Sequence, residues 1–394
     1  MRIVIITNIL SPYRRFFFDE LNKYLEKIDV QFNVILMADT ERGRSWKYED
    51  LKTDYTIKLP NKTLYIKDDI FIHINCGLEE KLKSLKPDIV IVGGGYLFPS
   101  VWNTIRLQKK LKYKLLFWSE SHLNSEKGYS SFKVRVREKI RQVLYNSFDG
   151  FLYSGDMSKK LIDFYCNKDK EMYLVPNLVD EEQFKKADFI RETSKKSLRE
   201  RYNIDFDRYI FICPARLEKV KGIEEFISIY QNISRECLDK ATLLICGDGE
   251  LRESISRLIE SINNVDIRLL GNKSQQELIE LYSLSDCFLL PSLSDANPLT
   301  CIESLWAGLP LLVSEHVGNH PEVVSEGENG YVFNYKDTLN AKEKIEKLIR
   351  SDDNWKKAAR NKSKEIALER FESRKIIEIL SDMLIENYNE ENYK

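Results

Sequence analysis

Two acidic residues, Asp295 and Glu303, stand on either side of the start of a predicted short helix. Asn297 is a good N-cap and Pro298 suits the first helical position, so the pattern predicts a helix over 298–307. The first N–H groups of a helix have no partner inside it, and together they form a ready site for an anion. The segment therefore combines an anion site with two carboxylates.

Glu303 lies two turns into this helix among apolar residues. A carboxylate in such surroundings needs a partner, because burying it alone is costly. An anion that also carries hydroxyl groups would satisfy both the helix start and the carboxylate, and a nucleotide-sugar is one such ligand. An ordinary capped helix is the alternative that this segment alone leaves open.

A second candidate group follows the predicted strand 208–213. Arg216 and Lys221 lie in the loop after this strand, and Gly222 precedes the next helix. A planar guanidinium and an ammonium group suit a diphosphate. Alone, the loop is typical of a solvated basic surface; together with the acidic segment it indicates a diphosphate site.

Short apolar runs alternate with longer amphipathic ones along the whole chain, a pattern typical of parallel sheets covered by helices. The predicted strands of the first half are 2–7, 30–37, 88–92, 114–118 and 149–153, and its helices lie near 13–27, 77–86, 99–111, 130–146 and 156–166. A polar stretch continues to about 205, and the strands then resume at 208–213, 241–246, 266–270, 287–290 and 311–314. We therefore expect two doubly wound units, over 1–177 and 178–370, and a terminal segment over 371–394.

The spacing Asp295-x7-Glu303 resembles the Glu-x7-Glu signature of retaining glycosyltransferases of family 4, which have the GT-B fold. The family's Gly-Arg-Leu-x-x-x-Lys-Gly pattern is matched from Ala215 to Gly222. The chain departs from these patterns in two places: Asp295 replaces a glutamate, and Ala215 stands where glycine is commoner. Further glycine-containing turns follow in the family's order, at 247–249, 270–271, 317–322 and 327–332.

The resemblance implies an α/β protein of two Rossmann-like domains that face each other across a cleft, with the terminal helix crossing back to the first domain. It implies a hexosyltransferase-type enzyme that moves a sugar from a nucleotide diphosphate, a UDP- or GDP-sugar, with retention of configuration. Arg216 and Lys221 would hold the diphosphate, Glu303 the ribose and Asp295 the sugar hydroxyls. No metal or other cofactor is expected. The expected donor contacts are Gly247, Gly249, Leu270, Gly271, Asn297, Leu299 and Thr300.

The first unit offers candidates for the acceptor side. His122 follows strand 114–118, where the family often carries a histidine near the reacting sugar, and we expect it to hydrogen bond there. Glu120 is either a contact to the acceptor or a surface charge. Gly94 and Gly95 let the backbone approach a ligand or another segment of the chain. The loop after the first strand adds Pro12, Tyr13 and Arg14.

Composition limits the classes of function. The 394 residues suffice for two domains, and 62 acidic against 61 basic residues give no overall field that would attract nucleic acid. Seven scattered cysteines without a Cys-x-x-Cys pair are typical of a reducing compartment, so we expect a cytoplasmic protein. The four histidines do not have the spacing of a zinc site. His316 and His320 are four residues apart, but the sequence offers no further zinc ligands to go with them.

Two basic stretches are compatible with an anionic membrane surface. Lys133, Arg137 and Arg141 share one helical face, and Arg14-Arg15 precedes Phe16-Phe17-Phe18. Equally, the charges can form a solvated face and the phenylalanines can belong to the core. A membrane-spanning segment is not expected, because no run of 18 apolar residues occurs.

The sequence is also compatible with other functions. A hydrolysing nucleotide-sugar epimerase of the same fold would turn over the donor without an acceptor. A catalytically silent partner subunit would bind the donor only, and Asp295 in place of glutamate favours that idea. A nicotinamide-dependent dehydrogenase is disfavoured because neither first strand leads into Gly-x-Gly-x-x-Gly. The family's commonest setting, cell-surface polysaccharide or lipopolysaccharide synthesis with a saccharide or lipid-linked acceptor, is our expectation.

Overall fold

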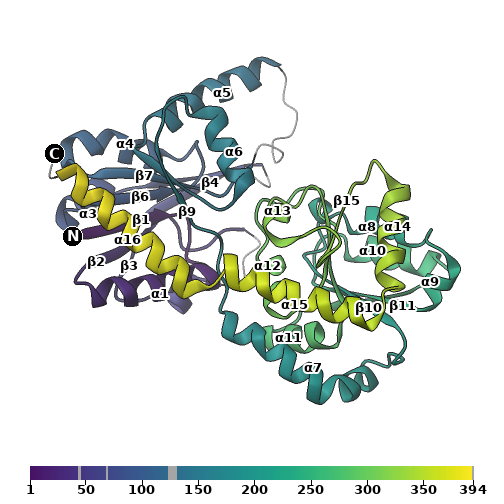
Figure 1. The fold of residues 1–394 in the computed structure, drawn as a ribbon. Helices are drawn as coiled ribbons and strands as arrows, with labels where there is room; N and C mark the ends of the chain where they lie inside the picture. The colour runs from purple at the N-terminus through teal and green to yellow at the C-terminus, as the bar shows by residue number, and fades with distance from the viewer. Residues whose placement is uncertain (43–45, 68–69, 123–130, 393–394) are drawn as a thin grey trace. The chain divides into compact units, whose positions relative to one another are not determined.

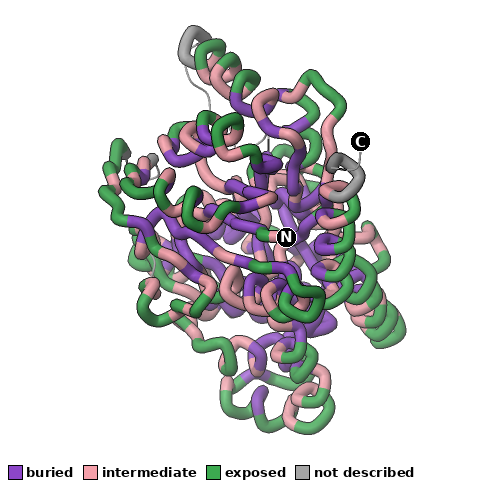
Figure 2. The backbone as a smooth tube through the Cα atoms, turned by 90° about the vertical axis from the view of Figure 1, so that its left-hand side faces the viewer, coloured by how far each residue is buried: buried purple, intermediate pink, exposed green. Residues whose placement is uncertain are grey.

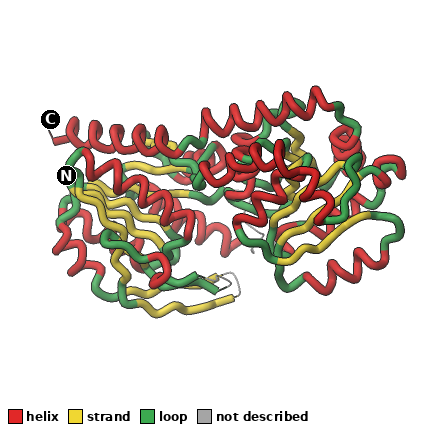
Figure 3. Tube along the Cα trace, turned by 90° about the horizontal axis from the view of Figure 1, so that it is seen from below, coloured by secondary structure: helices red, strands yellow, loops and turns green. Residues whose placement is uncertain are grey.

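The computed structural model describes residues 1–42, 46–67, 70–122 and 131–392. The chain divides into two compact units. Unit 1 comprises Met1–Leu178 together with Ser373–Lys394, and unit 2 comprises Val179–Glu372. Each unit contains its own parallel sheet with helices beside it, which Figure 3 shows as yellow strands among red helices.

Unit 1 contains a seven-stranded parallel sheet in the order β3-β2-β1-β6-β7-β8-β9. Its strands are β1 (Arg2–Thr7), β2 (Gln31–Leu36), β3 (Thr56–Lys58), β6 (Ile89–Gly93), β7 (Lys114–Ser119), β8 (Gly150–Tyr153) and β9 (Glu171–Leu174). Its helices are α1 (Pro12–Lys27), α2 (Tyr48–Leu51), α3 (Leu78–Leu85), α4 (Pro99–Leu111), α5 (Ser131–Asn146), α6 (Asp156–Tyr165) and α16 (Ser373–Asn392). Unit 1 also contains a separate two-stranded antiparallel sheet, formed by β4 (Asn61–Lys67) and β5 (Ile70–Asn75).

Alternation along β1 explains how both faces of this sheet are covered. Ile3 and Ile5 belong to one hydrophobic cluster, whereas Val4 and Ile6 belong to a second. The first cluster also contains Ile377, Leu380 and Leu384 of α16, which lies beside α1 (Figure 1). The last helix of the chain thus completes the core of unit 1.

Unit 2 contains a six-stranded parallel sheet in the order β12-β11-β10-β13-β14-β15. Its strands are β10 (Tyr209–Pro214), β11 (Ala241–Cys246), β12 (Asp266–Gly271), β13 (Cys287–Leu290), β14 (Leu311–Ser314) and β15 (Gly330–Phe333). Its helices are α7 (Glu181–Arg201), α8 (Ile223–Tyr230), α9 (Arg235–Asp239), α10 (Arg252–Ser261), α11 (Gln275–Leu284), α12 (Leu299–Trp306), α13 (His320–Val323), α14 (Thr338–Ile349) and α15 (Asp353–Arg370), with a 3-10 turn, η2 (Lys219–Lys221). Five of these strands are almost entirely buried, and β12, at the edge of the sheet, is only partly buried. Figure 2 shows the buried parts of the backbone in purple and the exposed parts in green.

The strand order places a topological switch point in each sheet. In unit 2 the order reverses between β10 and β13, and in unit 1 it reverses between β1 and β6. In open α/β sheets, ligands bind beyond the carboxyl ends of the strands at such a point. The loops after these four strands are therefore where function is expected.

The polar stretch up to about residue 205, to which the sequence analysis assigns no secondary structure, contains α7, a helix of 21 residues. Only a few of its residues are buried, among them Phe184, Ala187 and Leu198, because the helix lies on the surface of unit 2. A helix with so narrow an apolar face gives a weak periodic signal.

The fold also shows where the cysteines and the predicted membrane-facing residues lie. None of the helices in the described parts of the chain has the length and apolar character needed to cross a bilayer. All seven cysteines are free thiols, and five of them are buried. Phe17 and Phe18 lie in the core of unit 1, so these two residues of the Phe16–Phe18 run are not available to a membrane surface.

Candidate active site

The strongest group of candidate residues lies at the switch point of unit 2. The loop after β10 carries Arg216 and η2, and the loop after the neighbouring β13 carries Asp295. Lys221 Nζ lies 2.5 Å from Asp295 Oδ2, and both side chains are largely buried, at 16% and 14% exposure. The fold therefore joins the two motifs that the sequence places 74 residues apart.

Backbone packing fixes this contact. Val220 O accepts hydrogen bonds from Leu293 N at 2.8 Å and from Ser294 N at 3.2 Å. The hydroxyl of Tyr335 donates to Pro291 O at 2.5 Å and reaches Gly222 O at 3.1 Å. These bonds hold η2 against the loop after β13 and so set the position of Lys221.

Gly222 is essential to this packing. Its φ is +65°, and a Cβ there would lie 2.2 Å from Pro291 O. We expect Gly222→Ala to lower the free energy of unfolding by about 3 kcal/mol, because left-handed strain adds to a backbone clash. Gly327→Ala is a matched control, since its φ is +83° but nothing lies within 4 Å. That variant should lose only about 1 kcal/mol; equal losses in urea unfolding would contradict the packing argument.

Arg216 is more exposed than Lys221. Its side chain is 51% exposed, and its Nη1 lies 2.5 Å from Glu218 Oε1 in the same loop. An exposed guanidinium at the carboxyl end of β10 can turn toward a ligand, with Glu218 orienting it. The role of Arg216 in holding a diphosphate stays a prediction.

Gly247 and Gly249 support the Arg216 loop. A Cβ on Gly247 would lie 2.0 Å from Ala215 O, and one on Gly249 would lie 2.5 Å from Leu217 O. The loops are also joined by Leu217 N donating to Asp248 O at 3.0 Å. The backbone of the Arg216 loop thus approaches these two glycines closely. Their contact with a sugar donor stays a prediction.

The neighbouring turn continues the same edge of the sheet. Gly247 N donates to Gly271 O at 2.8 Å, so the turn of Leu270 and Gly271 lies next to the Gly247 loop. Gly271 has a φ of +69°, a conformation that favours glycine. The expected base contacts at this turn are not tested by the fold.

The start of α12 differs from the prediction. Helix α12 begins at Leu299, and Pro298 rather than Asn297 occupies the N-cap position. Asn319 Nδ2 donates to Asn297 Oδ1 at 3.0 Å and to Pro298 O at 3.0 Å, so the Asn297 side-chain oxygen is engaged elsewhere. Because proline has no side-chain acceptor, it cannot cap the N–H groups of Leu299 and Thr300. The first turn is therefore suited to an anionic ligand.

Glu303 lies inside unit 2, as its apolar neighbours in the sequence suggest. The residue is only 1% exposed, and Tyr282 of α11 donates its hydroxyl to Glu303 Oε2 at 2.9 Å. The Tyr282 contact orients the carboxylate from a helix that the sequence motif does not include. The neighbouring thiol of Cys301 is not a nucleophile candidate, because burial raises the pKa of Cys301 well above its ordinary value.

In unit 1, the candidates follow the adjacent strands β1, β6 and β7. Arg14 lies 2.6 Å from Glu120, and its guanidinium carbon lies 3.9 Å from the centre of the Trp118 ring. Pro12 opens α1, Tyr13 follows it, and His122 is buried at the end of the described segment after β7. Arg14 and Glu120 thus form a pair.

The space beside the glycines after β6 is occupied by other residues of the chain. A Cβ on Gly94 would lie 2.9 Å from Asn8 Oδ1 and 3.1 Å from the Phe98 ring, and one on Gly95 would lie 3.3 Å from that ring. Of the two options that the sequence leaves open, the structure thus shows an approach to another segment of the chain. A role of Gly94 and Gly95 toward an acceptor stays a prediction.

Three residues that hold the site in place could not be predicted from the two motifs. Tyr335, Asn319 and Tyr282 fix the loops and the carboxylate but lie outside the two motifs that predict chemistry. Within the described ranges, no three His, Cys, Asp or Glu side chains come together as metal ligands.

Part of unit 2 is similar to proteins of a known family. Residues 194–365 match the model of the family described as glycosyl transferases group 1. N-acetyl-alpha-D-glucosaminyl L-malate synthase of Bacillus anthracis is 27% identical over 208 residues, which is 53% of this chain and 52% of the relative. Alpha-monoglucosyldiacylglycerol synthase of Acholeplasma laidlawii is 28% identical over 189 residues, 46% of each chain. The chain thus matches about half the length of these curated relatives.

A solved structure supports the fold along the whole chain. The Anabaena protein Alr3699/HepE, solved in complex with UDP, superposes with a TM-score of 0.74 at 14% identity. The superposition covers 98% of this chain and 100% of that one. The similarity to the group 1 glycosyltransferases thus extends over most of unit 2. The architecture of both units and the superposition along the chain show that the protein has the GT-B fold.

Proposed function

We propose that this protein transfers a sugar from a nucleotide diphosphate to a saccharide or lipid-linked saccharide acceptor, with retention of configuration. The observation that carries this proposal is the contact of Lys221 with Asp295 at the switch point of unit 2, next to the start of α12. A cation, a helix start and a carboxylate then stand where a phosphorylated sugar would bind.

Each group has a role in this proposal. Lys221, Arg216 and the first N–H groups of α12 stabilise the diphosphate, whose negative charge increases as the bond to the sugar breaks. Because Lys221 contacts Asp295, a diphosphate held by Lys221 brings the attached sugar close to the Asp295 carboxylate. Glu303, oriented by Tyr282, accepts hydrogen bonds from the ribose.

The positive charge for the leaving group then comes from the protein. We expect the transfer rate to be unchanged by EDTA, because Arg216, Lys221 and the α12 start already neutralise the diphosphate. The measurement is the transfer rate with EDTA and with added Mg²⁺. A rate that falls with EDTA and returns with Mg²⁺ would contradict this part of the proposal.

We propose surface polysaccharide or lipopolysaccharide synthesis in the cytoplasm as the setting. The Acholeplasma relative is a synthase of a glucosylated diacylglycerol, which supports a lipid-linked acceptor. The HepE structure contains UDP, which makes a UDP-sugar the first donor to examine.

A membrane-facing surface fits this setting. Arg135, Val136, Lys139 and Val143 are exposed on α5, which combines cationic and apolar side chains. Arg141 does not belong to this face, because its guanidinium lies over the rings of Tyr96 and Tyr165.

We expect the double variant Arg135→Glu and Lys139→Glu to lose binding to anionic vesicles on the order of tenfold or more, at about 1 kcal/mol per cation removed. The measurement is co-sedimentation with vesicles of phosphatidylcholine and phosphatidylglycerol, with pure phosphatidylcholine as the control. Binding that does not depend on the anionic lipid would contradict peripheral association.

A nucleotide screen tests the donor site. UDP, GDP, ADP and their sugar conjugates should be compared by thermal shift, because a ligand that binds only the folded state raises the melting temperature. Stabilisation by one nucleotide that Arg216→Ala abolishes is the expected result. No stabilisation by any of them would contradict the proposed site.

Product analysis separates the remaining alternatives. Transfer of sugar to an added acceptor supports the transferase. Donor turnover without any acceptor would instead indicate an epimerase, and donor binding without turnover would indicate a silent partner subunit.

A further inference from the structure

The amino end of the unit 2 sheet carries a cavity of about 380 Å³. Tyr209 begins β10 and Asp286 immediately precedes β13, and both residues line it. The candidate active site lies beyond the other end of these strands. Because β10 has six residues, the two regions are about 20 Å apart.

The lining is strongly cationic. Three acidic residues, Asp207, Asp286 and Asp353, face six basic ones: Lys195, Arg199, Arg208, Lys240, Lys356 and Arg360. Two of these basic residues are paired outside the group, Arg208 with Asp266 at 3.5 Å and Lys240 with Glu236 at 3.0 Å. The other four still outnumber the acidic residues.

Asp286 is the buried carboxylate of this group, and three cations share it. It lies 3.1 Å from Lys195, 3.0 Å from Arg199 and 3.4 Å from Arg360. One carboxylate cannot neutralise three cations. Asp207 and Asp353 are exposed at the surface, and Asp353 reaches only Lys356, at 3.7 Å.

Within the described ranges, two lining residues carry a buried Nε without a partner. Arg199 is only 3% exposed; its Nη1 donates to the carbonyls of Asp205, Phe206 and Arg208 and its Nη2 to Asp286, while its Nε has no hydrogen-bond partner among the described residues. The Nε of Arg360 is likewise buried without a partner in the described part of the chain. Burial lowers the pKa of Lys195, and although Asp286 raises it, the charges of Arg199 and Arg360 lower it further. The positive charges therefore repel one another, and a bound anion would relieve this repulsion.

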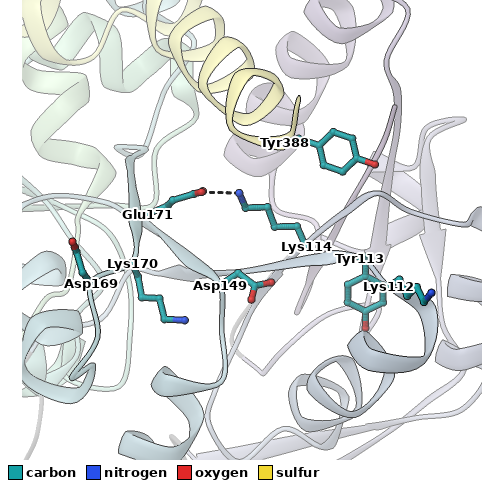
Figure 4. A pocket seen from close by; sticks show the side chains of 8 residues that line it. All are labelled: Lys112, Tyr113, Lys114, Asp149, Asp169, Lys170, Glu171 and Tyr388. Atoms are coloured by element: carbon teal, nitrogen blue, oxygen red, sulfur yellow. Dashed lines mark hydrogen bonds and ion pairs between the residues drawn. The ribbon is translucent and has the colours of Figure 1, made fainter. Parts of the chain in front are cut away.

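A cavity in unit 1 provides a contrast. It lies at the amino end of that sheet and is lined by Lys112, Lys114 and Lys170 and by Asp149, Asp169 and Glu171, three charges of each sign (Figure 4). Lys114 pairs with Glu171 at 2.8 Å. An excess of cations is thus not a general property of cavities at this end of a sheet in this protein.

We propose that the unit 2 cavity binds a small molecule that carries a diphosphate or two phosphate groups, at a site separate from the donor site. The cavity has room for about a dozen water molecules at their share of liquid volume, which exceeds the need of one phosphate. Arg360, Lys356 and Lys195 of the lining are cations that can donate hydrogen bonds to phosphate oxygens. This site goes beyond the proposed transfer reaction and does not depend on it.

The test uses pyrophosphate as the probe and the full chain with Arg216→Ala and Lys221→Ala, so that the donor site does not contribute. Isothermal titration at constant ionic strength should show binding. Adding Arg360→Gln or, as a milder change, Lys356→Gln should raise the Kd on the order of tenfold. Lys170→Gln, from the charge-balanced cavity, is the matched control and should leave the Kd unchanged.

Pyrophosphate that fails to bind, or a Kd that neither Arg360→Gln nor Lys356→Gln changes, would overturn the proposal. UDP binding by the chain with Arg360→Gln alone should stay normal, which separates this site from the proposed donor site. Co-sedimentation with vesicles containing phosphatidylinositol 4-phosphate, which carries two phosphate groups, that is lost in Arg360→Gln would identify a lipid headgroup as the source of the phosphates; no such loss would assign them to a free phosphorylated molecule.

Discussion

Replacing Lys221 with alanine is expected to lower kcat/KM by about a hundredfold, because one charge-stabilising donor at a developing anion typically contributes this much. Lys221 is the largely buried cation at the switch point, and its ammonium lies 2.5 Å from Asp295. The loss should appear mainly in kcat, since the diphosphate gains charge as the bond to the sugar breaks. The measurement is steady-state transfer with the nucleotide-sugar that the thermal-shift screen identifies.

Lys219 offers a matched control within the same turn. Its side chain is 64% exposed and pairs with Glu225 at 2.5 Å, so it is two residues from Lys221 but held by a different partner. Lys219→Ala should leave the rate within about twofold, because exposed ion pairs contribute little. A near-normal rate for Lys221→Ala, or equal losses in both variants, would refute the assignment of Lys221 to the diphosphate.

Removal of Lys221 also leaves Asp295 without its cation. Asp295→Asn separates the two effects, because it removes the carboxylate charge while Lys221 stays in place. If Lys221 acts on the diphosphate, Lys221→Ala should be slow, and the double variant should be slower than Asp295→Asn alone. Recovery of the rate in the double variant would show instead that the unpaired carboxylate causes the loss.

The location of the site could be predicted from the sequence because it depends on local patterns. Buried strands followed by loops with Arg216 and Asp295 indicate the carboxyl edge of a parallel sheet. The contact between Lys221 and Asp295 then follows from the strand order, in which β10 and β13 are neighbours. Sequence patterns indicate which residues leave the sheet at this edge, but not how their side chains are held.

The supporting contacts could not be predicted because they join distant parts of the chain. Tyr335 is 113 residues from Gly222, and Asn319 is 22 residues from Asn297. Asn297 has the residue type of an N-cap, but Asn319 bonds its side-chain oxygen and Pro298 takes the cap position. Local propensity was overruled here by a tertiary hydrogen bond.

The two glycines at 247 and 249 illustrate the same limit. A Gly-x-Gly turn after a strand indicates that something approaches the backbone closely, without identifying what approaches. In this fold the carbonyls of Ala215 and Leu217 occupy that space. The turn therefore positions the Arg216 loop, a role that depends on the neighbouring strands β10 and β11.

The largest effect on stability is expected at Asp286. Asp286→Ala should lower the free energy of unfolding by about 3–5 kcal/mol, because it removes the buried carboxylate shared by Lys195, Arg199 and Arg360 and leaves their charges uncompensated. It also removes the acceptor of the Ile210 N–H, at 3.0 Å. The measurement is urea unfolding followed by circular dichroism.

Asp353→Ala is the matched control for this prediction. Asp353 lines the same cavity, but its side chain is fully exposed and lies 3.7 Å from Lys356. Its removal should change the free energy of unfolding by less than about 0.5 kcal/mol. A comparable loss in both variants would mean that the general charge of the region, rather than the buried network, determines stability.

The pH dependence of the Asp286 network follows from the direction of its pKa. Burial alone raises the pKa of Asp286, but the charges of Lys195, Arg199 and Arg360 and the hydrogen bond from the Ile210 N–H together outweigh this, and the pKa lies below its ordinary value. The unfolded chain then binds the proton more readily than the folded one, so the contribution of Asp286 is complete above the ordinary aspartate pKa, about 3.9. It is lost as the pH falls through the lower pKa of the folded state. The difference in unfolding free energy between the native chain and Asp286→Ala should therefore be constant near neutral pH and shrink only in acid. A difference that already shrinks between pH 7 and pH 5 would show that the network does not hold this carboxylate ionised.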